Sequence, residues 1–303
     1  MERPHKAGFV AIIGAPNAGK STLLNYFLKE KLAIVAAKPQ TTRHKILGII
    51  TEENFQVIFW DTPGYHVSER LLNKEMMSRT LSALTDADVV LWLVDGRKQG
   101  RDHEAVRELI LKTQKEKLLI AISKADLVEK TALDEIATKV AEEIKDCPVF
   151  QVSAKTGKDM DRLKSSLVEL LPESGPFFPE DVFTDQPMRL IAAEFVREAV
   201  FRLLRNELPY STAVTIDEYR EPAKSDSGLQ TYIAATIHVE KENQKGIMIG
   251  NRGLMLKEIG TRARLALEKM IEGPVFLKLF VRVTKDWSKK KSSIHEFGYG
   301  DKS

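Results

Sequence analysis

GAPNAGKS, residues 14–21, is the stretch that predicts the fold of this 303-residue chain. It follows the apolar run 9–13, precedes a helical pattern at 20–28, and fits the spacing G-x-x-x-x-G-K-[ST]. In a loop of this kind the glycines let backbone N–H groups converge on phosphate oxygens, and the helix that follows adds its positive dipole end. We therefore expect a phosphate-binding loop between a strand and a helix.

The side chains of this loop predict individual roles at a bound nucleotide. Lys20 is expected to neutralise the β and γ phosphates, and Ser21 is expected to bind Mg²⁺. The loop alone does not distinguish ATP from GTP, or a kinase from a hydrolase. The residues expected to line the phosphates are Gly14, Ala15, Pro16, Asn17, Ala18, Gly19, Lys20, Ser21 and Thr22.

Strand-like apolar runs alternate with helical patterns through the first half of the chain. The expected strands are 9–13, 46–51, 55–60, 89–94, 118–122 and 149–152, and the expected helices are 20–28, 71–84, 103–113, 133–144 and 160–170. This alternation is typical of an α/β domain in which helices cover both faces of a mostly parallel sheet. Only three residues separate the second and third strands, so that pair is expected to be antiparallel.

Residues 172–187, PESGPFFPEDVFTDQP, contain four prolines and cannot continue a helix or a central strand. We interpret them as a linker between a first domain, residues 1–171, and a second domain, residues 188–303. The second part shows a helical pattern at 188–206, strands at 212–219 and 229–239, a helix at 254–271, a strand at 275–283 and a short basic tail. That order predicts a small α+β domain.

The composition is that of a soluble globular protein, with 43% hydrophobic and 29% charged residues. Cys147 is the single cysteine, which excludes an internal disulfide and a cysteine zinc site and favours a reducing cytoplasm. No apolar run approaches the roughly 18 residues that span a bilayer. Composition leaves a peripheral association with the inner face of the cell membrane open.

The charge of the chain is unevenly distributed. Residues 241–303 carry 14 Lys or Arg against 7 Asp or Glu, a net charge of +7, whereas residues 1–240 have a net charge of −4. A basic end on an acidic chain indicates contact with a polyanion. A basic surface that is merely solvated is the alternative.

Two further motifs complete the expected phosphate site. DTPG, residues 61–64, ends an apolar strand, so Asp61 is placed to reach the Mg²⁺ shell and Gly64 to offer its N–H to the γ-phosphate. Thr42, in the polar stretch PQTTR, could complete the Mg²⁺ shell through its hydroxyl. The metal ligands expected are thus Ser21, Thr42 and Asp61. DTPG and the residue after it add five expected nucleotide contacts: Asp61, Thr62, Pro63, Gly64 and Tyr65.

The next motifs predict the base. In SKAD, residues 123–126, Asp126 can accept hydrogen bonds from guanine N1–H and the 2-amino group, whereas adenine would leave the carboxylate unpaired. In SAK, residues 153–155, the backbone N–H of Ala154 could meet guanine O6. The expected base contacts are Ser123, Lys124, Ala125, Asp126, Ser153, Ala154 and Lys155.

In this order, GAPNAGKS, TTR, DTPG, SKAD and SAK, residues 8–170 resemble the translation-factor-related GTPases and, among them, the Era family. The resemblance implies a P-loop GTPase that uses Mg²⁺ and turns over slowly. One position departs from the family pattern, because Ser123 stands where the guanine motif normally has Asn. That Asn usually ties the phosphate loop to the base loop and contacts guanine. We therefore expect a loss of about 0.5–1.5 kcal/mol per missing hydrogen bond, with specificity kept by Asp126.

Tyr65 occupies the place where many small GTPases have a water-orienting Gln. Similar GTPases with an aromatic or hydrophobic residue here often use K⁺, bound with the help of an Asn at the position of Asn17. A cation there substitutes for an arginine finger on the developing charge. The alternative is that Asn17 only shapes the loop. The resemblance thus implies a catalytic set of Lys20, Asn17 and Thr42.

GNRG, residues 250–253, lies between an apolar stretch and a helix and fits the GxxG loop of a KH domain, which approaches a sugar-phosphate chain. A lone GxxG is weak evidence, and a helix-entry loop is the alternative. The order of elements around it resembles the type II KH domain of the Era family. The RNA contacts expected here are Gly250, Asn251, Arg252, Gly253 and Lys257.

The last strand, VFLKLFVRV at 275–283, has two different faces. Its odd-numbered residues are apolar and predict the core, whereas its even-numbered residues interleave aromatic rings with cations, as suits stacking on unpaired bases. The alternative is that the N-terminal helix of this domain covers the second face. The RNA contacts expected from this strand and the basic tail are Phe276, Lys278, Phe280, Arg282, Lys285, Lys289, Lys290 and Lys291.

These features predict a GTP-hydrolysing switch coupled to an RNA-binding KH domain. The Era resemblance implies that the RNA is the 3′ end of 16S ribosomal RNA and that a monomer acts in 30S subunit assembly. GTP, unlike GDP, would order the loop around Thr42 and the segment after Gly64. Two alternatives stay open: an RNA chaperone with a purely structural nucleotide site, and a small-molecule kinase. The guanine motif and the lack of an arginine-rich lid insertion disfavour the kinase.

Overall fold

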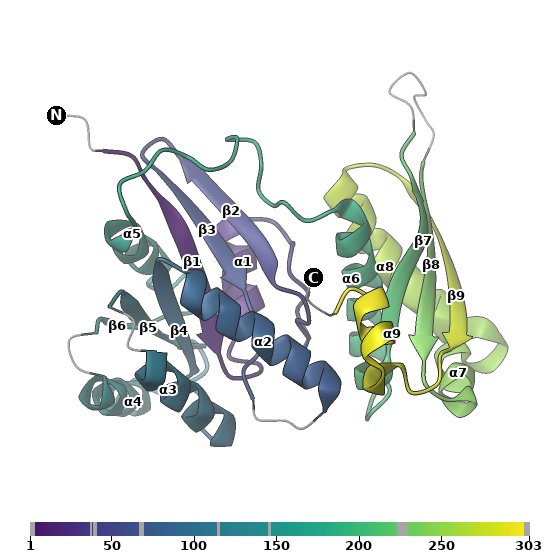
Figure 1. Cartoon of the computed structure of the whole chain (residues 1–303), viewed down its shortest axis with the longest axis horizontal. Coiled ribbons are helices and arrows are strands. Elements are labelled where there is room, and N and C mark those ends of the chain that lie inside the picture. The colour runs from purple at the N-terminus through teal and green to yellow at the C-terminus, as the bar shows by residue number, and fades with distance from the viewer. Residues whose placement is uncertain are drawn as a thin grey trace. The chain divides into compact units, whose positions relative to one another are not determined.

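The computed structural model describes residues 4–36, 38, 41–66, 70–113, 116–144, 147–222 and 230–299. By contacts, the chain forms two compact units (Figure 1). The first contains residues 1–33, 42–69 and 73–185, and the second contains 34–41, 70–72 and 186–303. None of the described helices is long and apolar enough to cross a lipid bilayer.

The first unit is built on a sheet that has six strands within the described residues, in the order β2-β3-β1-β4-β5-β6. All neighbours are parallel except β2 and β3, so the expected antiparallel pair is confirmed. The strands are β1 (Lys6–Gly14), β2 (Ile46–Glu52), β3 (Phe55–Asp61), β4 (Val89–Asp95), β5 (Leu118–Ser123) and β6 (Val149–Gln151). The order reverses at β1, which places the phosphate loop at the switch point of the sheet.

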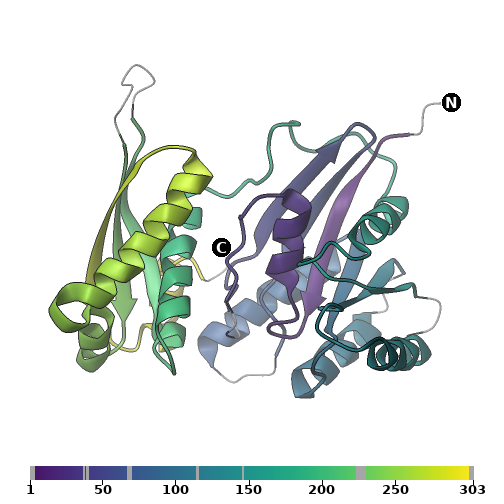
Figure 2. The ribbon, with the colours of Figure 1, turned by 180° about the vertical axis from the view of Figure 1, so that it is seen from behind.

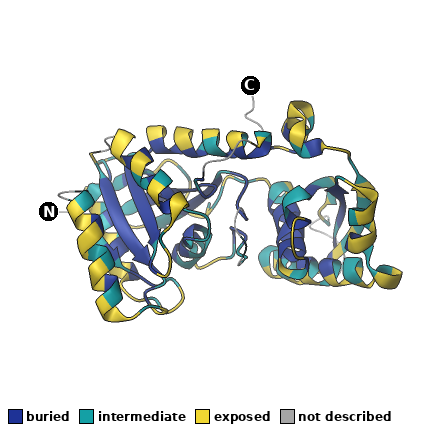
Figure 3. Ribbon diagram, turned by 90° about the horizontal axis from the view of Figure 1, so that it is seen from below, coloured by how far each residue is buried: buried dark blue, intermediate teal, exposed yellow. Residues whose placement is uncertain are grey.

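Helices cover both faces of this sheet. The helices are α1 (Lys20–Leu28), α2 (Leu71–Asp86), α3 (Arg101–Thr113), α4 (Lys130–Glu143) and α5 (Met160–Leu170). Buried residues of α2, α3 and α4 form one core with β1, β4 and β5, whereas α1 and α5 lie on the opposite face (Figures 1 and 2). Because both faces are covered, β4 and β5 are continuous apolar runs rather than alternating ones. Figure 3 shows these strands as buried and the helices as exposed on their outer sides.

Residues 172–185 pack along the first unit. Gln56, which is fully buried in β3, accepts hydrogen bonds from the backbone N–H groups of Phe177 (2.7 Å) and Phe178 (3.0 Å). Thr184 donates its hydroxyl to the carbonyl of Leu47 at 2.6 Å. The proline-rich stretch up to residue 185 is therefore an extended segment that is hydrogen-bonded to the first unit.

Within the described residues, the second unit contains a three-stranded sheet in the order β7-β8-β9, and α6, α7 and α8 pack on one of its faces (Figure 1). Strands β7 and β8 are antiparallel, and β8 and β9 are parallel. The elements are α6 (Met188–Leu203), β7 (Ala213–Arg220), β8 (Thr231–Val239), α7 (Glu242–Ile249), α8 (Leu254–Ile271), β9 (Val275–Val283) and α9 (Lys291–Glu296). Residue 229, where the expectation for β8 began, lies outside the described residues.

Two helices of this unit differ from the sequence-based prediction. Residues 242–249, interpreted as a turn region and an apolar stretch, form α7. Gln244 caps it by accepting hydrogen bonds from the backbone N–H groups of Glu240 and Lys241, and Met248 anchors it in the core. The expected basic tail also folds: Trp287 and Ile294 are fully buried, and Lys291–Glu296 is helical. Both segments are polar in composition, but buried apolar side chains stabilise helical structure in each of them.

The segment Ile34–Thr41 belongs to the second unit by its contacts. Glu198 of α6 accepts from the backbone N–H of Val35 at 3.4 Å. Arg197, which is fully buried, forms an ion pair with Glu194 and donates to the carbonyl of Thr41. A buried ion pair therefore holds the backbone directly before Thr42.

Candidate nucleotide site and nucleic-acid interface

The predicted nucleotide motifs meet at one edge of the first sheet. GAPNAGKS connects β1 to α1, DTPG begins at the last residue of β3, SKAD begins at the last residue of β5, and SAK follows β6. The carboxyl ends of parallel strands share an edge, so residues from four distant parts of the chain surround one site.

The phosphate loop of the site is held by its own lysine. Lys20 is buried, and its Nζ donates to the carbonyls of Gly14 and Ala15, each at 3.0 Å. Burial lowers the pKa of Lys20 to about 8, partly offset by the carboxylate of Asp61. A buried ammonium that faces the loop interior is positioned for an anionic ligand.

The three predicted Mg²⁺ ligands lie together. The Oγ of Ser21 is 2.8 Å from the Oγ1 of Thr42 and donates to Oδ2 of Asp61 at 2.7 Å. The other carboxylate oxygen of Asp61, Oδ1, is buried without a hydrogen-bond partner, and burial raises the pKa of Asp61 to about 6. Hard oxygen donors around an unsatisfied carboxylate fit Mg²⁺, which would supply the missing positive charge.

The DTPG loop packs tightly against the phosphate loop. A Cβ on Gly64 would lie 2.6 Å from the Cα of Pro16, so only glycine permits this approach. The backbone N–H of Tyr65 donates to the carbonyl of Gly14 at 3.1 Å, and the Tyr65 ring packs against the core. Thr62 is tied to β1 by a 2.7 Å hydrogen bond to the carbonyl of Ile12. DTPG is therefore more than a local turn, because it is fixed to the phosphate loop.

Asn17 adopts a left-handed backbone conformation, with φ 65°. Asn tolerates this region better than most residues, so loop shape alone is a sufficient reason for an Asn here. Its carbonyl accepts a hydrogen bond from Nζ of Lys124 in the base motif. The structure thus gives Asn17 a backbone role, and its cation-binding role stays a prediction.

A pocket of about 170 Å³ adjoins the phosphate loop at the base motifs. Asp126 and Lys124 line it, together with Ala154 and Lys155 of the SAK motif. Ser153 donates to Oδ1 of Asp126 at 2.7 Å, which fixes the carboxylate. The pocket therefore brings the two predicted base motifs together around a fixed acceptor. Ala125 is buried in the core behind it.

Ser123 retains one of the two functions expected of an Asn at this position. Its hydroxyl lies 2.6 Å from the carbonyl of Ala18 and 3.0 Å from that of Val94, and the residue is buried. The phosphate loop is therefore tied to the end of β5 without an amide. Serine makes this tie because the two chain segments lie close enough for a hydroxyl, and the expected loss of nucleotide affinity stays a prediction.

Arg97 also lines the base pocket, although the sequence motifs did not include it. It follows β4 by two residues and forms an ion pair with Asp95, with Nη2 3.3 Å from Oδ2. The signal that could have identified it is its position just after the carboxyl end of a parallel strand.

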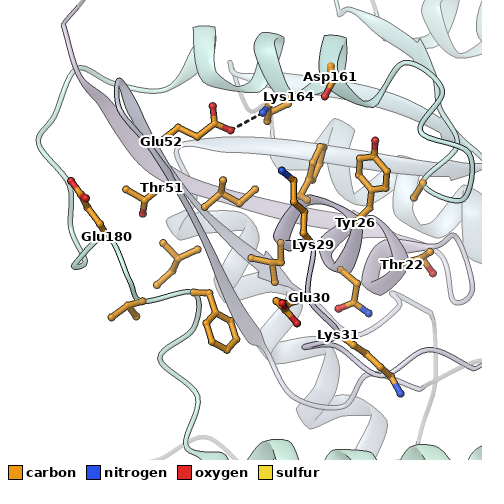
Figure 4. A pocket seen from close by; sticks show the side chains of 18 residues that line it. Thr22, Tyr26, Lys29, Glu30, Lys31, Thr51, Glu52, Asp161, Lys164 and Glu180 are labelled. Atoms are coloured by element: carbon orange, nitrogen blue, oxygen red, sulfur yellow. Dashed lines mark hydrogen bonds and ion pairs between the residues drawn. The ribbon is translucent and has the colours of Figure 1, made fainter. Parts of the chain in front are cut away.

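A larger cavity, of about 890 Å³, lies beside the base pocket and shares Thr22 and Ala154 with it. Figure 4 shows its lining, with Tyr26 and Lys29 from the end of α1 and an ion pair between Lys164 and Glu52 at 2.7 Å on one side. Basic and acidic side chains alternate around it, so its charge favours no single class of ligand.

The GNRG loop connects α7 to α8. Gly250, Arg252 and Gly253 all have positive φ, and the side chains of Asn251 and Arg252 are exposed. Lys257 is exposed one turn into α8. The loop thus presents backbone and one guanidinium to solvent, as contact with a sugar-phosphate chain requires.

The even-numbered face of β9 is exposed. Phe276 and Phe280 are 47% and 45% accessible, so the alternative that the N-terminal helix of the domain covers this face is wrong. Tyr232 of β8 stacks on Phe276 with centroids 5.7 Å apart, and Lys278 lies over the Phe280 ring. The odd-numbered residues pack into the core with the helices. GNRG therefore belongs to the helical layer, and the aromatic residues lie on the opposite face of the sheet.

The remaining predicted RNA contacts are exposed cations near the end of the chain. Lys289 forms a surface ion pair with Asp286 at 2.7 Å. The other exposed cations of this group are Arg282, Lys285, Lys290 and Lys291.

The chain matches known families in both units. The family model for a 50S ribosome-binding GTPase matches residues 9–124, and the model for a KH domain matches residues 207–288. GTPase Era of Geobacter metallireducens is 44% identical over 298 residues, which cover 98% of this chain and 99% of that one. GTPase Era of Carboxydothermus hydrogenoformans is 39% identical, with 97% and 98% covered.

Two solved Era structures resemble the whole chain. Era in complex with MgGDPNP and nucleotides 1506–1542 of 16S ribosomal RNA is 37% identical, has a TM-score of 0.92, and covers 98% of this chain and 100% of that one. A tyrosine-to-alanine variant of Aquifex aeolicus Era bound to GDP and AlF₄⁻ is 36% identical, with the same TM-score and coverage. The chain therefore belongs to the Era family of GTPases, with a P-loop GTPase domain followed by a KH domain.

Proposed function

We propose that this GTPase couples GTP binding and hydrolysis to binding of the 3′ end of 16S ribosomal RNA by its KH domain. The observation that supports this most is the full-length similarity to an Era structure that holds MgGDPNP and nucleotides 1506–1542 of that RNA. The cellular role would be assembly of the 30S subunit and maturation of its ribosomal RNA.

The residues around the nucleotide phosphates would have separate binding roles. The loop N–H groups and Lys20 would hold the phosphates, and Gly64 would offer its N–H to the γ-phosphate. Ser21, Thr42 and Asp61 would hold Mg²⁺, which neutralises charge that develops on the phosphate oxygens. Their mutual distances of 2.7 and 2.8 Å support this assignment.

Intrinsic hydrolysis is expected to be slow, because Tyr65 stands in place of a water-orienting glutamine and its ring packs on the core. We propose that K⁺ accelerates the reaction with the help of Asn17. Asn17→Gly tests this directly, since glycine keeps the left-handed backbone and removes only the carboxamide. We expect the wild type to hydrolyse GTP faster in K⁺ than in Na⁺. We expect Asn17→Gly to hydrolyse GTP at the same rate in both. Equal wild-type rates would exclude the cation.

RNA binding with a GTP analogue, with GDP and without nucleotide tests the coupling. Tighter binding of single-stranded RNAs from the 16S 3′ end in the GTP-analogue state is expected, with a steep loss on adding salt. Equal affinity in all three states would exclude a switch and favour the RNA chaperone. Residues 37, 39, 40 and 67–69, within the two segments that GTP is expected to order, lie outside the described residues.

Location and assembly state complete the proposal. We expect a monomer in the cytoplasm. Peripheral association of a fraction of the protein with the inner face of the cell membrane is the second outcome that these tests address. Light scattering of the purified chain and cell fractionation test these points separately from nucleotide and RNA binding.

A further inference from the structure

A guanine base needs both acceptors and donors from its pocket. Its N1–H and 2-amino group donate, whereas O6 and N7 accept. Asp126, fixed by Ser153, is the acceptor in the pocket, and the backbone N–H of Ala154 is the donor expected for O6. Any residue that contacts N7 has to be a further donor.

Ser123 cannot be that donor. A hydroxyl carries one proton, and the Oγ of Ser123 already lies 2.6 Å from the carbonyl of Ala18 and 3.0 Å from that of Val94. Lys124 is engaged as well, with Nζ bound to the carbonyl of Asn17 and to Oδ2 of Asp95, the latter at 2.5 Å. Both side chains thus serve the protein scaffold.

Arg97 lies beside Ser123 in the same pocket. Asp95 is paired with Ser123 across β4 and β5, and the backbone N–H of Gly96 donates to the Ser123 carbonyl at 3.1 Å. Asp95 then accepts from the backbone N–H of Arg97 (3.0 Å), from Nε (3.3 Å) and from Nη2 (3.3 Å). These bonds fix the guanidinium through one edge. Among the described residues, Nη1 of Arg97 makes no hydrogen bond, and the side chain is 48% exposed.

We propose that Arg97 reads the N7 edge of the guanine base and supplies the donor that Ser123 does not. Arginine donating to guanine N7 and O6 is a favoured geometry, because the planar guanidinium presents parallel N–H groups. Asp126 and Arg97 then read opposite edges of one base, and their charges attract. The inference rests on the assignment of this pocket to guanine.

The competing explanation is that Arg97 only supports Asp95, which in turn holds Lys124. Removal of Arg97 would then weaken all guanine nucleotides equally. A base that lacks N7 distinguishes the two explanations, because it loses only a direct contact.

The experiment measures equilibrium affinities of the full chain for GDP, 7-deaza-GDP, IDP and ADP, in the wild type and in Arg97→Ala. The wild type is expected to prefer GDP over 7-deaza-GDP by about ten-fold, the size of one charge-assisted hydrogen bond. In Arg97→Ala this ratio falls to about one, while the preference of GDP over IDP, which depends on Asp126, stays unchanged. Adding Ser123→Asn to Arg97→Ala is expected to restore the ratio.

Arg101→Ala is the matched control, since Arg101 is an exposed arginine at the start of α3. If Arg97→Ala fails to bind nucleotide, Arg97→Met gives the same comparison, because methionine keeps the length of the side chain and has no N–H donor. A wild-type ratio of one, or a ratio that Arg97→Ala leaves unchanged, overturns the proposal. Binding of ADP as tight as GDP would instead contradict the guanine assignment itself.

Discussion

The two functional regions of this GTPase are built in different ways. The nucleotide site collects short motifs at the ends of parallel strands, and the fold brings them to one edge of a sheet. The candidate RNA surfaces have only the four-residue GNRG loop as a motif, and the remainder depends on which face of β9 stays exposed. Sequence motifs therefore indicate most residues of the nucleotide site. The residues of the RNA surfaces depend on how the helices pack on the second sheet.

If this comparison holds, single substitutions should act on one region and spare the other. Lys20→Ala is expected to have the largest effect, a loss of GTP affinity of about 100-fold, because it removes a buried ammonium worth about 3 kcal/mol to bound phosphates. Fluorescent-nucleotide titration measures it, with the exposed Lys112→Ala as control. RNA affinity without nucleotide should not change. Unaltered GTP affinity would contradict the assignment of the phosphate loop.

The difference between the regions also explains what sequence could predict. The strands and the GAPNAGKS, DTPG, SKAD and SAK positions follow from local pattern, because a strand end fixes where a motif lies. The hydrogen bond between Ser123 and Ala18 joins residues 105 positions apart. A local sequence pattern cannot predict how close two such distant residues lie in the fold. Arg97 was missed for a different reason: it belongs to none of the nucleotide motifs, and only its position just after the carboxyl end of β4 could have indicated it. Helix α7 was missed because Gly246 and Gly250 resemble a turn in sequence.

The second-largest effect is expected at GNRG. Asn251→Asp with Arg252→Asp places two negative charges against a sugar-phosphate chain and removes one positive charge, and we expect about 30-fold weaker RNA binding, or roughly 2 kcal/mol. Both side chains are exposed, so the fold should be retained. Electrophoretic mobility shifts at fixed salt measure the loss. GTP affinity should be unaffected, and a matched loss of GTP affinity would show that the two regions are not separable in this way.

Acid should affect the two units in opposite directions. Burial lowers the pKa of His238 to about 4, helped by Arg282 and opposed by Asp217. The unfolded chain therefore binds more protons between about pH 4 and 6.5, and the KH domain loses about 2 kcal/mol of unfolding free energy between pH 7 and 5. Asp61, whose pKa burial raises to about 6, has the reverse sign, so without Mg²⁺ the first unit gains about 1 kcal/mol over the same range.

Hydrogen exchange of β8 and β1, corrected for intrinsic rates, measures the two trends separately. His238→Gln should remove the loss in β8, and Asp61→Asn should remove the gain in β1. Parallel trends in both strands, or an acid loss in β8 that His238→Gln leaves intact, would contradict the assignment.

The smallest expected effect tests whether the open face of β9 takes part in RNA binding at all. Phe280 is 45% exposed and lies under the Lys278 ammonium, so an unpaired base could stack on the ring. Phe280→Ala is expected to weaken RNA binding about five-fold, near the lower limit of one stacked base. Leu265→Ala is the matched control, because Leu265 is an apolar side chain on α8 that is 55% exposed. If Phe280→Ala behaves like the control while the GNRG variant loses affinity, RNA binds only along the helical layer. The aromatic face would then be a separate surface with a different use.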